Sequence, residues 1–262
     1  MFLRHLARQL SGAVAVATIA VAIAGCSSVP NLGDTTGSVA NGPRTETDAR
    51  RDLDALADKH RANPRDPDTA LAYAKALRAT KQYTQATAVL EQASLASPFN
   101  KVLLGAYGRS LADVGQYKKA LDVFERAHTP EDPDWRILSA QGTVLDQLGR
   151  HTDAQRYYSS ALKIVPDEPS VLSNLGLSYA LAKNLPRAEE TLRRATTGPN
   201  PDPRVRQNLA LVVGLQGRFA EAESIARADL PAEEAASNVS YLRQMLADAK
   251  QGKKLKGVET GT

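Results

Sequence analysis

Five short stretches decide the fold: Tyr83-Thr84-Gln85-Ala86, Tyr117-Lys118-Lys119-Ala120, His151-Thr152-Asp153-Ala154, Leu185-Pro186-Arg187-Ala188 and Phe219-Ala220-Glu221-Ala222. Each has a bulky residue followed three positions later by alanine, and the five alanines are spaced 34 residues apart without slippage. A fixed period of this length indicates a repeat architecture, in which no unit buries its apolar face alone and neighbours must stack. The sequence therefore predicts five similar units over residues 67–234.

Other positions fall into the same register. Twelve residues before each alanine stands a small residue, and four residues after it stands a large apolar residue in four of the five units. Small residues let two helices approach closely while larger neighbours fill the holes beside the crossing. The small residues are Ala74, Gly108, Gly142, Gly176 and Ala210, and the large ones are Leu90, Phe124, Tyr158 and Leu192, with Ala226 as the weak fifth.

This pattern resembles the tetratricopeptide repeat (TPR). The resemblance implies an all-α fold, a right-handed superhelical solenoid of five helix-turn-helix units with a capping helix on either side. A coiled coil is the alternative for such a long helical pattern, but the apolar residues do not keep a heptad across the glycine turns.

Glycine turns and apolar periodicity predict where the helices lie. The two capping helices are expected at residues 47–64 and 235–251, because each segment carries apolar residues on one face. The five expected helix pairs are about 68–80 and 84–96, 101–114 and 118–128, 134–148 and 152–164, 169–182 and 186–197, and 203–216 and 220–229.

Residues 1–25 have the features of a signal peptide: a basic start and then an uncharged, largely apolar run that is too short to span a bilayer. The run ends in Ile23-Ala24-Gly25-Cys26, which resembles the lipobox of bacterial lipoproteins and implies lipidation of Cys26. Ser27, where Asp would imply retention at the inner membrane, favours the outer membrane and a periplasm-facing domain. The alternative is a soluble secreted protein with a chance cysteine near its cleavage site.

Two further segments are predicted to lack a packed structure. Residues 26–46 are rich in Ser, Thr, Gly, Asn and Pro and are expected to form a flexible tether. Residues 252–262 are expected to be a disordered tail, with Lys253, Lys254 and Lys256 solvated. The formal net charge of +4 is close to balance, and no nucleic-acid footprint is expected.

No catalytic constellation emerges from the residues that could carry chemistry. The four histidines are scattered, and none forms a His-x-x-x-His pair, so we expect no metal site. Ser160-Ala161-Leu162-Lys163 matches the Ser-x-x-Lys pattern of some serine nucleophiles, but it lies within an expected helix and the companion motifs are missing. We therefore expect a protein that is not an enzyme, with no cofactor and no small-molecule substrate.

A stack of helix pairs offers a groove, lined mainly by first helices, that binds an extended or helical segment of a partner. Here the groove is predicted to be polar and partly cationic, which suits a partner with acidic residues or a free carboxylate. The alternative is that each of these residues is an ordinary solvated side chain. The predicted groove residues are Lys75, Arg78, Arg109, Asp113, Arg136, Ser139, Thr143, Asp146, Ser173, Asn174, Arg204, Gln207, Asn208, Tyr241 and Met245.

The last third of the chain is more specific than the general repeat. The stretch Val205-Arg-Gln-Asn-Leu-Ala-Leu-Val-Val-Gly-Leu-Gln-Gly-Arg-Phe-Ala-Glu-Ala-Glu223, followed by Asp229-Leu230 and Asn238-Val-Ser-Tyr-Leu-Arg243, resembles the end of TadD-type lipoproteins of the tight-adherence (Flp) pilus system. Two residues depart from the repeat pattern: Arg206, where a large apolar residue is usual, and Asp229, where Ala is usual.

The resemblance implies a scaffold for Flp pilus assembly that acts like a pilotin. Its partner would be the outer-membrane secretin subunit or another pilus-assembly protein. Two alternatives remain: a general envelope adaptor that recruits peptidoglycan enzymes or assists β-barrel assembly, and, more weakly, a hydrolase that uses Ser160.

Overall fold

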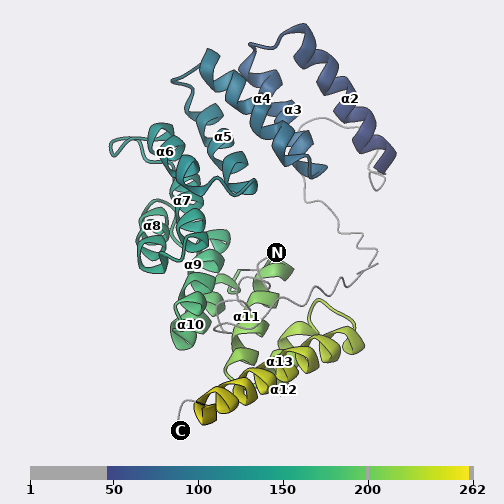
Figure 1. Ribbon diagram of the computed structural model, residues 1–262, viewed down its shortest axis with the longest axis vertical. Helices are drawn as coiled ribbons and strands as arrows, with labels where there is room; N and C mark the ends of the chain where they lie inside the picture. The colour runs from purple at the N-terminus through teal and green to yellow at the C-terminus, as the bar shows by residue number, and fades with distance from the viewer. Residues whose placement is uncertain (1–45, 199–200, 260–262) are drawn as a thin grey trace. The chain divides into compact units, whose positions relative to one another are not determined.

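The computed structural model describes residues 46–198 and 201–259, which form twelve α-helices and no strand (Figure 1). They divide into two compact units, residues 46–127 and residues 128–259. The first unit comprises α2 (Glu46–Ala62), α3 (Pro67–Ala79), α4 (Tyr83–Ala96), α5 (Lys101–Asp113) and α6 (Tyr117–Ala127). The second comprises α7 (Trp135–Gln147), α8 (His151–Ile164), α9 (Pro169–Leu181), α10 (Leu185–Ala195), α11 (Pro203–Leu215), α12 (Phe219–Ala226) and α13 (Ala232–Glu259).

The first helix of each pair begins at an acidic or amide side chain that accepts a hydrogen bond from the backbone of the first turn. Asp66 accepts from the Thr69 amide at 3.0 Å, and Asn100 accepts from the Leu103 amide at 3.1 Å. Such caps satisfy amides that have no partner inside the helix. The same role falls to Asp134, Glu168 and Asp202 at the starts of α7, α9 and α11.

The turn that joins the two helices of each pair contains one residue with a left-handed (positive φ) backbone conformation. Three turns use glycine, and two use Lys81 and Lys183, with φ of 63° and 64°. Glycine has no Cβ and adopts this conformation without steric cost, whereas a lysine there is strained by about 1 kcal/mol. The three glycines are Gly115, Gly149 and Gly217.

The 34-residue pattern explains the packing within each pair. The five alanines that define the period are fully buried, at 0% exposure. At the small position, Gly108 and Gly176 face the large side chains of Phe124 and Leu192 from the second helix of the same pair. The predicted small-to-large contact is therefore confirmed. The buried alanines are Ala86, Ala120, Ala154, Ala188 and Ala222.

The capping helices pack against the pairs next to them. Leu53 of α2 lies against the apolar core of the first pair, which includes Ala74 and Leu77. At the other end of the chain, α13 contacts both α11 and α12. Leu242 of α13 occupies the space over Gly214, where an added Cβ would stand 2.5 Å from the Leu242 Cδ2 atom.

The expected helix pairs lie within three residues of the observed ones, but α13 differs from the expected closing helix. It begins at Ala232 rather than Ala235 and continues to Glu259, so residues 252–259 are helical where a disordered tail was predicted. The segment contains no proline, and its lysines, Leu255 and Glu259 favour continuation of the helix, while Gly252 and Gly257 each oppose it by about 1 kcal/mol.

The predicted signal peptide, Cys26 and nearly all of the tether lie outside the described residues. In the part of the chain that is described, no helix is long and apolar enough to cross a membrane.

Candidate protein-binding face

Among the first helices of the pairs, α7 contacts α9, and α9 contacts α11. Polar side chains link these three helices across a shared face. Asn174 Nδ2 donates to Ser139 Oγ at 3.4 Å, and Asn208 Nδ2 donates to Ser173 Oγ at 3.0 Å. The two serines occupy equivalent positions 34 residues apart, as do the two asparagines. The 34-residue period therefore produces a repeating asparagine–serine ladder along this face.

In the ladder the serines are covered and the amides are more accessible. Ser139 and Ser173 are only 8% and 6% exposed, whereas Asn174 and Asn208 are half-buried. The prediction of an open groove is therefore wrong for the two serines, because the asparagine of the next unit covers each of them. They instead hold the amides in place at the surface.

Asp146 was also predicted to line the groove, but its side chain is 4% exposed and forms the centre of a buried polar cluster. Its carboxylate lies 2.8 Å from His151 Nδ1 and accepts hydrogen bonds from Ser178 Oγ at 2.8 Å and Tyr158 Oη at 3.1 Å. These contacts join α7, α8 and α9. Asp146 therefore holds three helices together rather than facing a partner.

Burial raises the pKa of Asp146 above its ordinary value, although hydrogen bonds from His151, Ser178 and Tyr158 oppose the shift. Burial likewise raises the pKa of Tyr158 well above the usual range, and the nearby Asp146 charge adds to the rise. A carboxylate with a raised pKa can indicate a catalytic acid. Here its oxygens are occupied by neighbouring side chains and covered from solvent, which favours a structural role.

Other predicted residues of this face are open to solvent. Arg136, Thr143 and Gln207 are exposed, and the Arg136 guanidinium stacks 4.5 Å from the centroid of the Trp135 ring. Arg204 is exposed but pairs with Asp202 at 2.8 Å, next to the start of its own helix. Arg136 thus presents a positioned cation, whereas the charge of Arg204 is largely neutralised.

On α13 the two predicted residues differ in accessibility. Tyr241 is 65% exposed, and Met245 is half-buried. Tyr241 is thus the more accessible of the two to a partner.

The unit of residues 46–127 has a corresponding face on α3 and α5, which contact each other. Lys75 is exposed, and Arg109 is half-buried. Arg78 Nε pairs with Asp113 Oδ2 at 2.5 Å, so these two predicted groove residues bind each other. The positive charge of this face is therefore smaller than the sequence suggested.

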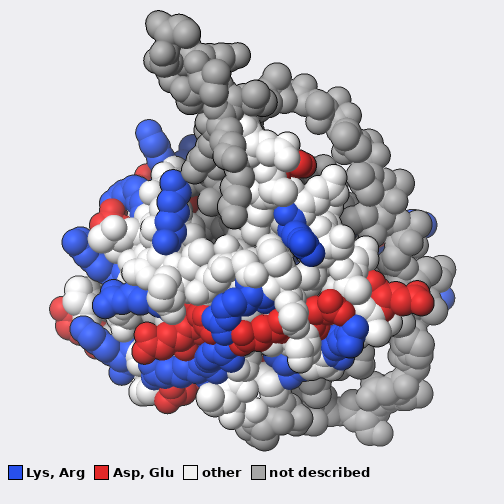
Figure 2. Space-filling view, turned by 90° about the horizontal axis from the view of Figure 1, so that it is seen from below, with Lys and Arg blue, Asp and Glu red and all other residues white. Residues whose placement is uncertain are grey.

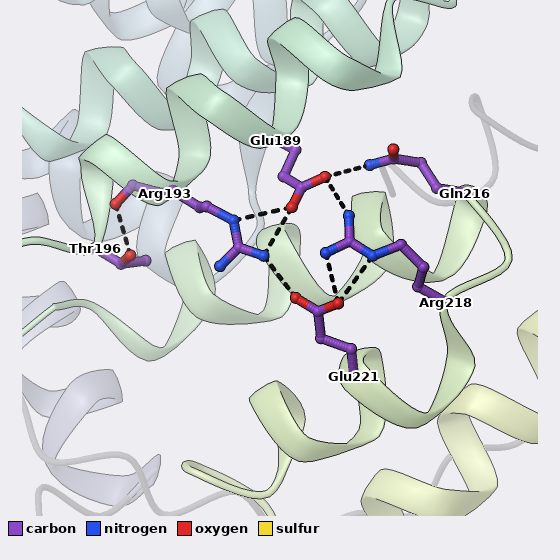
Figure 3. Close-up of polar contacts among 6 residues, drawn as sticks. All are labelled: Glu189, Arg193, Thr196, Gln216, Arg218 and Glu221. Atoms are coloured by element: carbon purple, nitrogen blue, oxygen red, sulfur yellow. Dashed lines mark hydrogen bonds and ion pairs between the residues drawn. The ribbon is translucent and has the colours of Figure 1, made fainter.

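A five-residue charge cluster on α10, α12 and the turn before α12 was not predicted (Figure 3). Glu189 accepts from Arg193 at 2.7 Å, Gln216 at 2.7 Å and Arg218 at 2.6 Å, and both arginines also pair with Glu221. Only the pairs three or four residues apart on one helix or at its start could have been found from sequence. The others depend on the tertiary packing that brings the turn before α12, and Glu221 at its start, within reach of the side chains of α10.

Glu189 is the most strongly perturbed acid of this cluster. Burial alone would raise its pKa, but hydrogen bonds from Gln216, Arg193 and Arg218 outweigh that effect and hold the pKa at about 2. The cluster pairs two carboxylates with two guanidinium groups, so its charges cancel, and it ties the fourth helix pair to the fifth. On the face of the molecule drawn in Figure 2, acidic and basic side chains are likewise interleaved rather than separated by sign.

Two other kinds of site, a metal site and a serine nucleophile, have little support among the described residues. They include no group of three or more His, Cys, Asp or Glu side chains placed to hold a metal ion. Ser160 lies in the middle of α8, next to the fully buried Ala161. The serine of the Ser-x-x-Lys match thus belongs to a packed second helix.

Comparison with known proteins agrees with this geometry. Family models described as tetratricopeptide repeat match residues 139–203 and 203–228. The family model of anaphase-promoting complex, cyclosome, subunit 3 matches residues 54–127. The chain is built from tetratricopeptide repeats. No curated protein sequence shows a significant match to it.

Solved TPR structures share this fold. PilW, described as a widely conserved type IV pilus biogenesis factor, has a TM-score of 0.65 at 18% identity, covering 74% of this chain and 91% of PilW. PilF of Pseudomonas aeruginosa has a TM-score of 0.53 at 16% identity, covering 82% and 86%. The Cut9–Hcn1 assembly of the anaphase-promoting complex has 0.61 at 16%, covering 80% and 41%. At these identities the likeness concerns the TPR fold alone.

Proposed function

We propose that this TPR chain is an outer-membrane lipoprotein that scaffolds assembly of a Flp-type pilus. It would act like a pilotin, binding the secretin subunit or another pilus component without catalysis. The observation that carries the proposal is the resemblance of residues 205–243 to TadD-type lipoproteins. The lipobox-like sequence ending at Cys26 and the TPR fold shared with PilW, described as a type IV pilus biogenesis factor, support the same assignment.

The asparagine–serine ladder suggests how a partner would be held. Each amide has two N–H groups and an oxygen, so a bond from Asn174 or Asn208 to its serine leaves capacity for a partner's main chain. Because the ladder repeats with the helix pairs, an extended segment could use both amides at once. Arg136, stacked on Trp135, would supply a cation for an acidic side chain or a terminal carboxylate at one end of this face.

The test is affinity capture of the secretin from detergent-solubilised membranes. We expect the wild-type chain to recover it and expect the Asn174→Ala/Asn208→Ala and Arg136→Glu variants to recover markedly less. Lys163→Glu, a charge reversal at an exposed position on the second helix α8, is the matched control and should behave as wild type.

Recovery of secretin at the same level by all variants would show that the face with the asparagine–serine ladder and Arg136 does not bind it. Recovery of a peptidoglycan enzyme or a β-barrel assembly component in place of any pilus protein would favour the general envelope adaptor.

A further inference from the structure

An exposed apolar turn lies between the first two helix pairs. Leu95, Phe99 and Val102 are 79%, 92% and 67% exposed, and all three lie within eight consecutive residues from the end of α4 to the first turn of α5. Apolar side chains scattered singly over a surface are ordinary, but a cluster of this kind indicates an interaction site. These three residues are called the apolar turn below.

The repeat architecture does not require apolar residues at these positions. The equivalents of Leu95 and Phe99 in later units are polar, charged or proline, and the equivalents of Val102 are charged or polar. The apolar character is therefore specific to this turn and is not a feature of the repeat. The equivalent residues are Thr129, Lys163 and Thr197; Pro133, Asp167 and Pro201; and Asp68, Arg136, Ser170 and Arg204.

Phe99 and Val102 project outward and do not line a pocket, whereas Leu95 lies at the wall of a hollow of about 350 Å³ beside the turn. The walls of this hollow also include the charged residues Glu91, Lys119 and Asp122. A protein segment seated in the hollow would therefore leave most of the apolar turn in water. A surface that surrounds protruding apolar side chains suits them better, and the boundary between lipid headgroups and acyl chains is such a surface.

We propose that the apolar turn inserts into the bilayer to which the chain is anchored. The inference rests on the lipid anchor at Cys26 in the proposed function. Only 20 residues separate Cys26 from Glu46, so the chain between them can reach at most about 70 Å, which keeps the unit of residues 46–127 close to the membrane.

The lipid anchor allows the apolar turn to insert even if its own affinity for the membrane is weak. Once the anchor is in the bilayer, insertion of the turn is intramolecular and benefits from a high effective concentration. The inserted turn would fix the orientation of the unit of residues 46–127 relative to the membrane. That orientation would determine which side of the unit faces a periplasmic partner.

The test uses the full mature protein reconstituted in vesicles of phosphatidylethanolamine and phosphatidylglycerol. Cys26 is the only cysteine, and lipidation blocks its thiol, so Leu95→Cys introduces a unique site for an environment-sensitive fluorophore. Lys163→Cys places the same label at the equivalent exposed position two units later. We expect lipids with brominated acyl chains to quench the label at position 95 and to leave the label at position 163 unchanged.

Equal fluorescence of both labels with and without brominated lipid would overturn the insertion and assign the turn to a protein partner. The anchor is scored separately by whether the protein floats with the vesicles. A protein that fails to float would contradict the lipoprotein assignment without bearing on the turn.

A second measurement needs no anchor. In a full-length Cys26→Ser background, Phe99→Ser/Val102→Ser should weaken binding to the same vesicles by at least about tenfold, since two apolar side chains no longer leave water. Ile164→Ser, at another exposed apolar residue, is the control and should have no effect. Because the substituted side chains are exposed, the helical circular dichroism signal should be unchanged. Equal binding by the double variant and its parent would also overturn the proposal.

Discussion

Gly142 of α7 and Tyr158 of α8 are in such close contact that a Cβ atom on Gly142 would stand 2.6 Å from Cε1 of the Tyr158 ring. Real Cβ atoms do not approach this closely, so the ring, the helix or both would have to move. Tyr158 has little room to do so, because it is 1% exposed and its hydroxyl is bonded to Asp146.

The first prediction follows from this contact. Gly142→Ala should lower the free energy of unfolding by about 1–3 kcal/mol, because overpacking at the helix crossing outweighs the helix propensity that alanine gains. Urea denaturation followed by circular dichroism measures the change. Gly198→Ala is the control, since a Cβ at Gly198 meets nothing within 4 Å. Equal stability of the two variants would contradict the tight crossing.

The second prediction concerns the buried acceptor at Asp146. Asp146→Ala should lower the free energy of unfolding by about 2–4 kcal/mol, because the Ser178 and Tyr158 hydroxyls lose their buried acceptor. Asp146→Asn should cost less, since the amide oxygen still accepts from these groups and no charge is buried. Chemical denaturation of the three proteins at neutral pH decides the order. An asparagine variant as unstable as the alanine variant would show that the charge itself is required.

The third prediction explains the two departures from the repeat pattern. Arg206 of α11 pairs with Asp229, which follows α12, through two guanidinium nitrogens: Nε donates to Oδ2 at 2.7 Å, and Nη2 donates to the other carboxylate oxygen. The Asp229 side chain is 7% exposed. The two unusual residues thus satisfy each other.

Arg206→Leu alone should therefore destabilise the chain by about 1–3 kcal/mol, because it leaves a covered carboxylate unpaired. Arg206→Leu/Asp229→Ala, which restores the usual residue types, should recover stability to within about 1 kcal/mol of wild type. A double-mutant cycle of thermal unfolding tests the coupling. Additive losses in the double variant would mean that the pair does not act as a unit.

The fourth prediction is a pH dependence at Glu189. Its pKa is held at about 2 in the folded chain, below the ordinary value of 4.5. The stabilisation is therefore fully present above pH 4.5 and is lost as pH falls toward 2. Glu189→Gln should cost about 1–2 kcal/mol at pH 7, the figure being reduced by the solvent exposure of both arginines, and close to nothing near pH 2.

Stability measured against pH for wild type and Glu189→Gln gives the difference directly. The neighbouring, exposed Glu190→Gln is the matched control and should show a difference near zero throughout. If the Glu189→Gln difference stays constant from pH 7 to pH 2, the charge cluster does not provide the stabilisation.

The binding face shows the limit of reasoning from sequence. The repeat register indicated which residues belong to first helices, and it placed Asn174 and Asn208 at equivalent positions. It could not show that Ser139, Ser173 and Asp146 are covered, because covering depends on the neighbouring helix rather than on the residue's own helix. The Arg78–Asp113 pair, 35 residues apart, was missed for the same reason.

The sequence by itself determined the number of helix pairs, their boundaries and their internal packing. These depend on short-range periodicity and on small and large residues that meet within one unit of 34 residues. Only the tertiary structure decided which polar side chains stay open, which acids and bases pair, and that Leu242 fills the space over Gly214. Those outcomes are set by how the side chains of adjacent units interlock, a relation between distant residues that local periodicity does not encode.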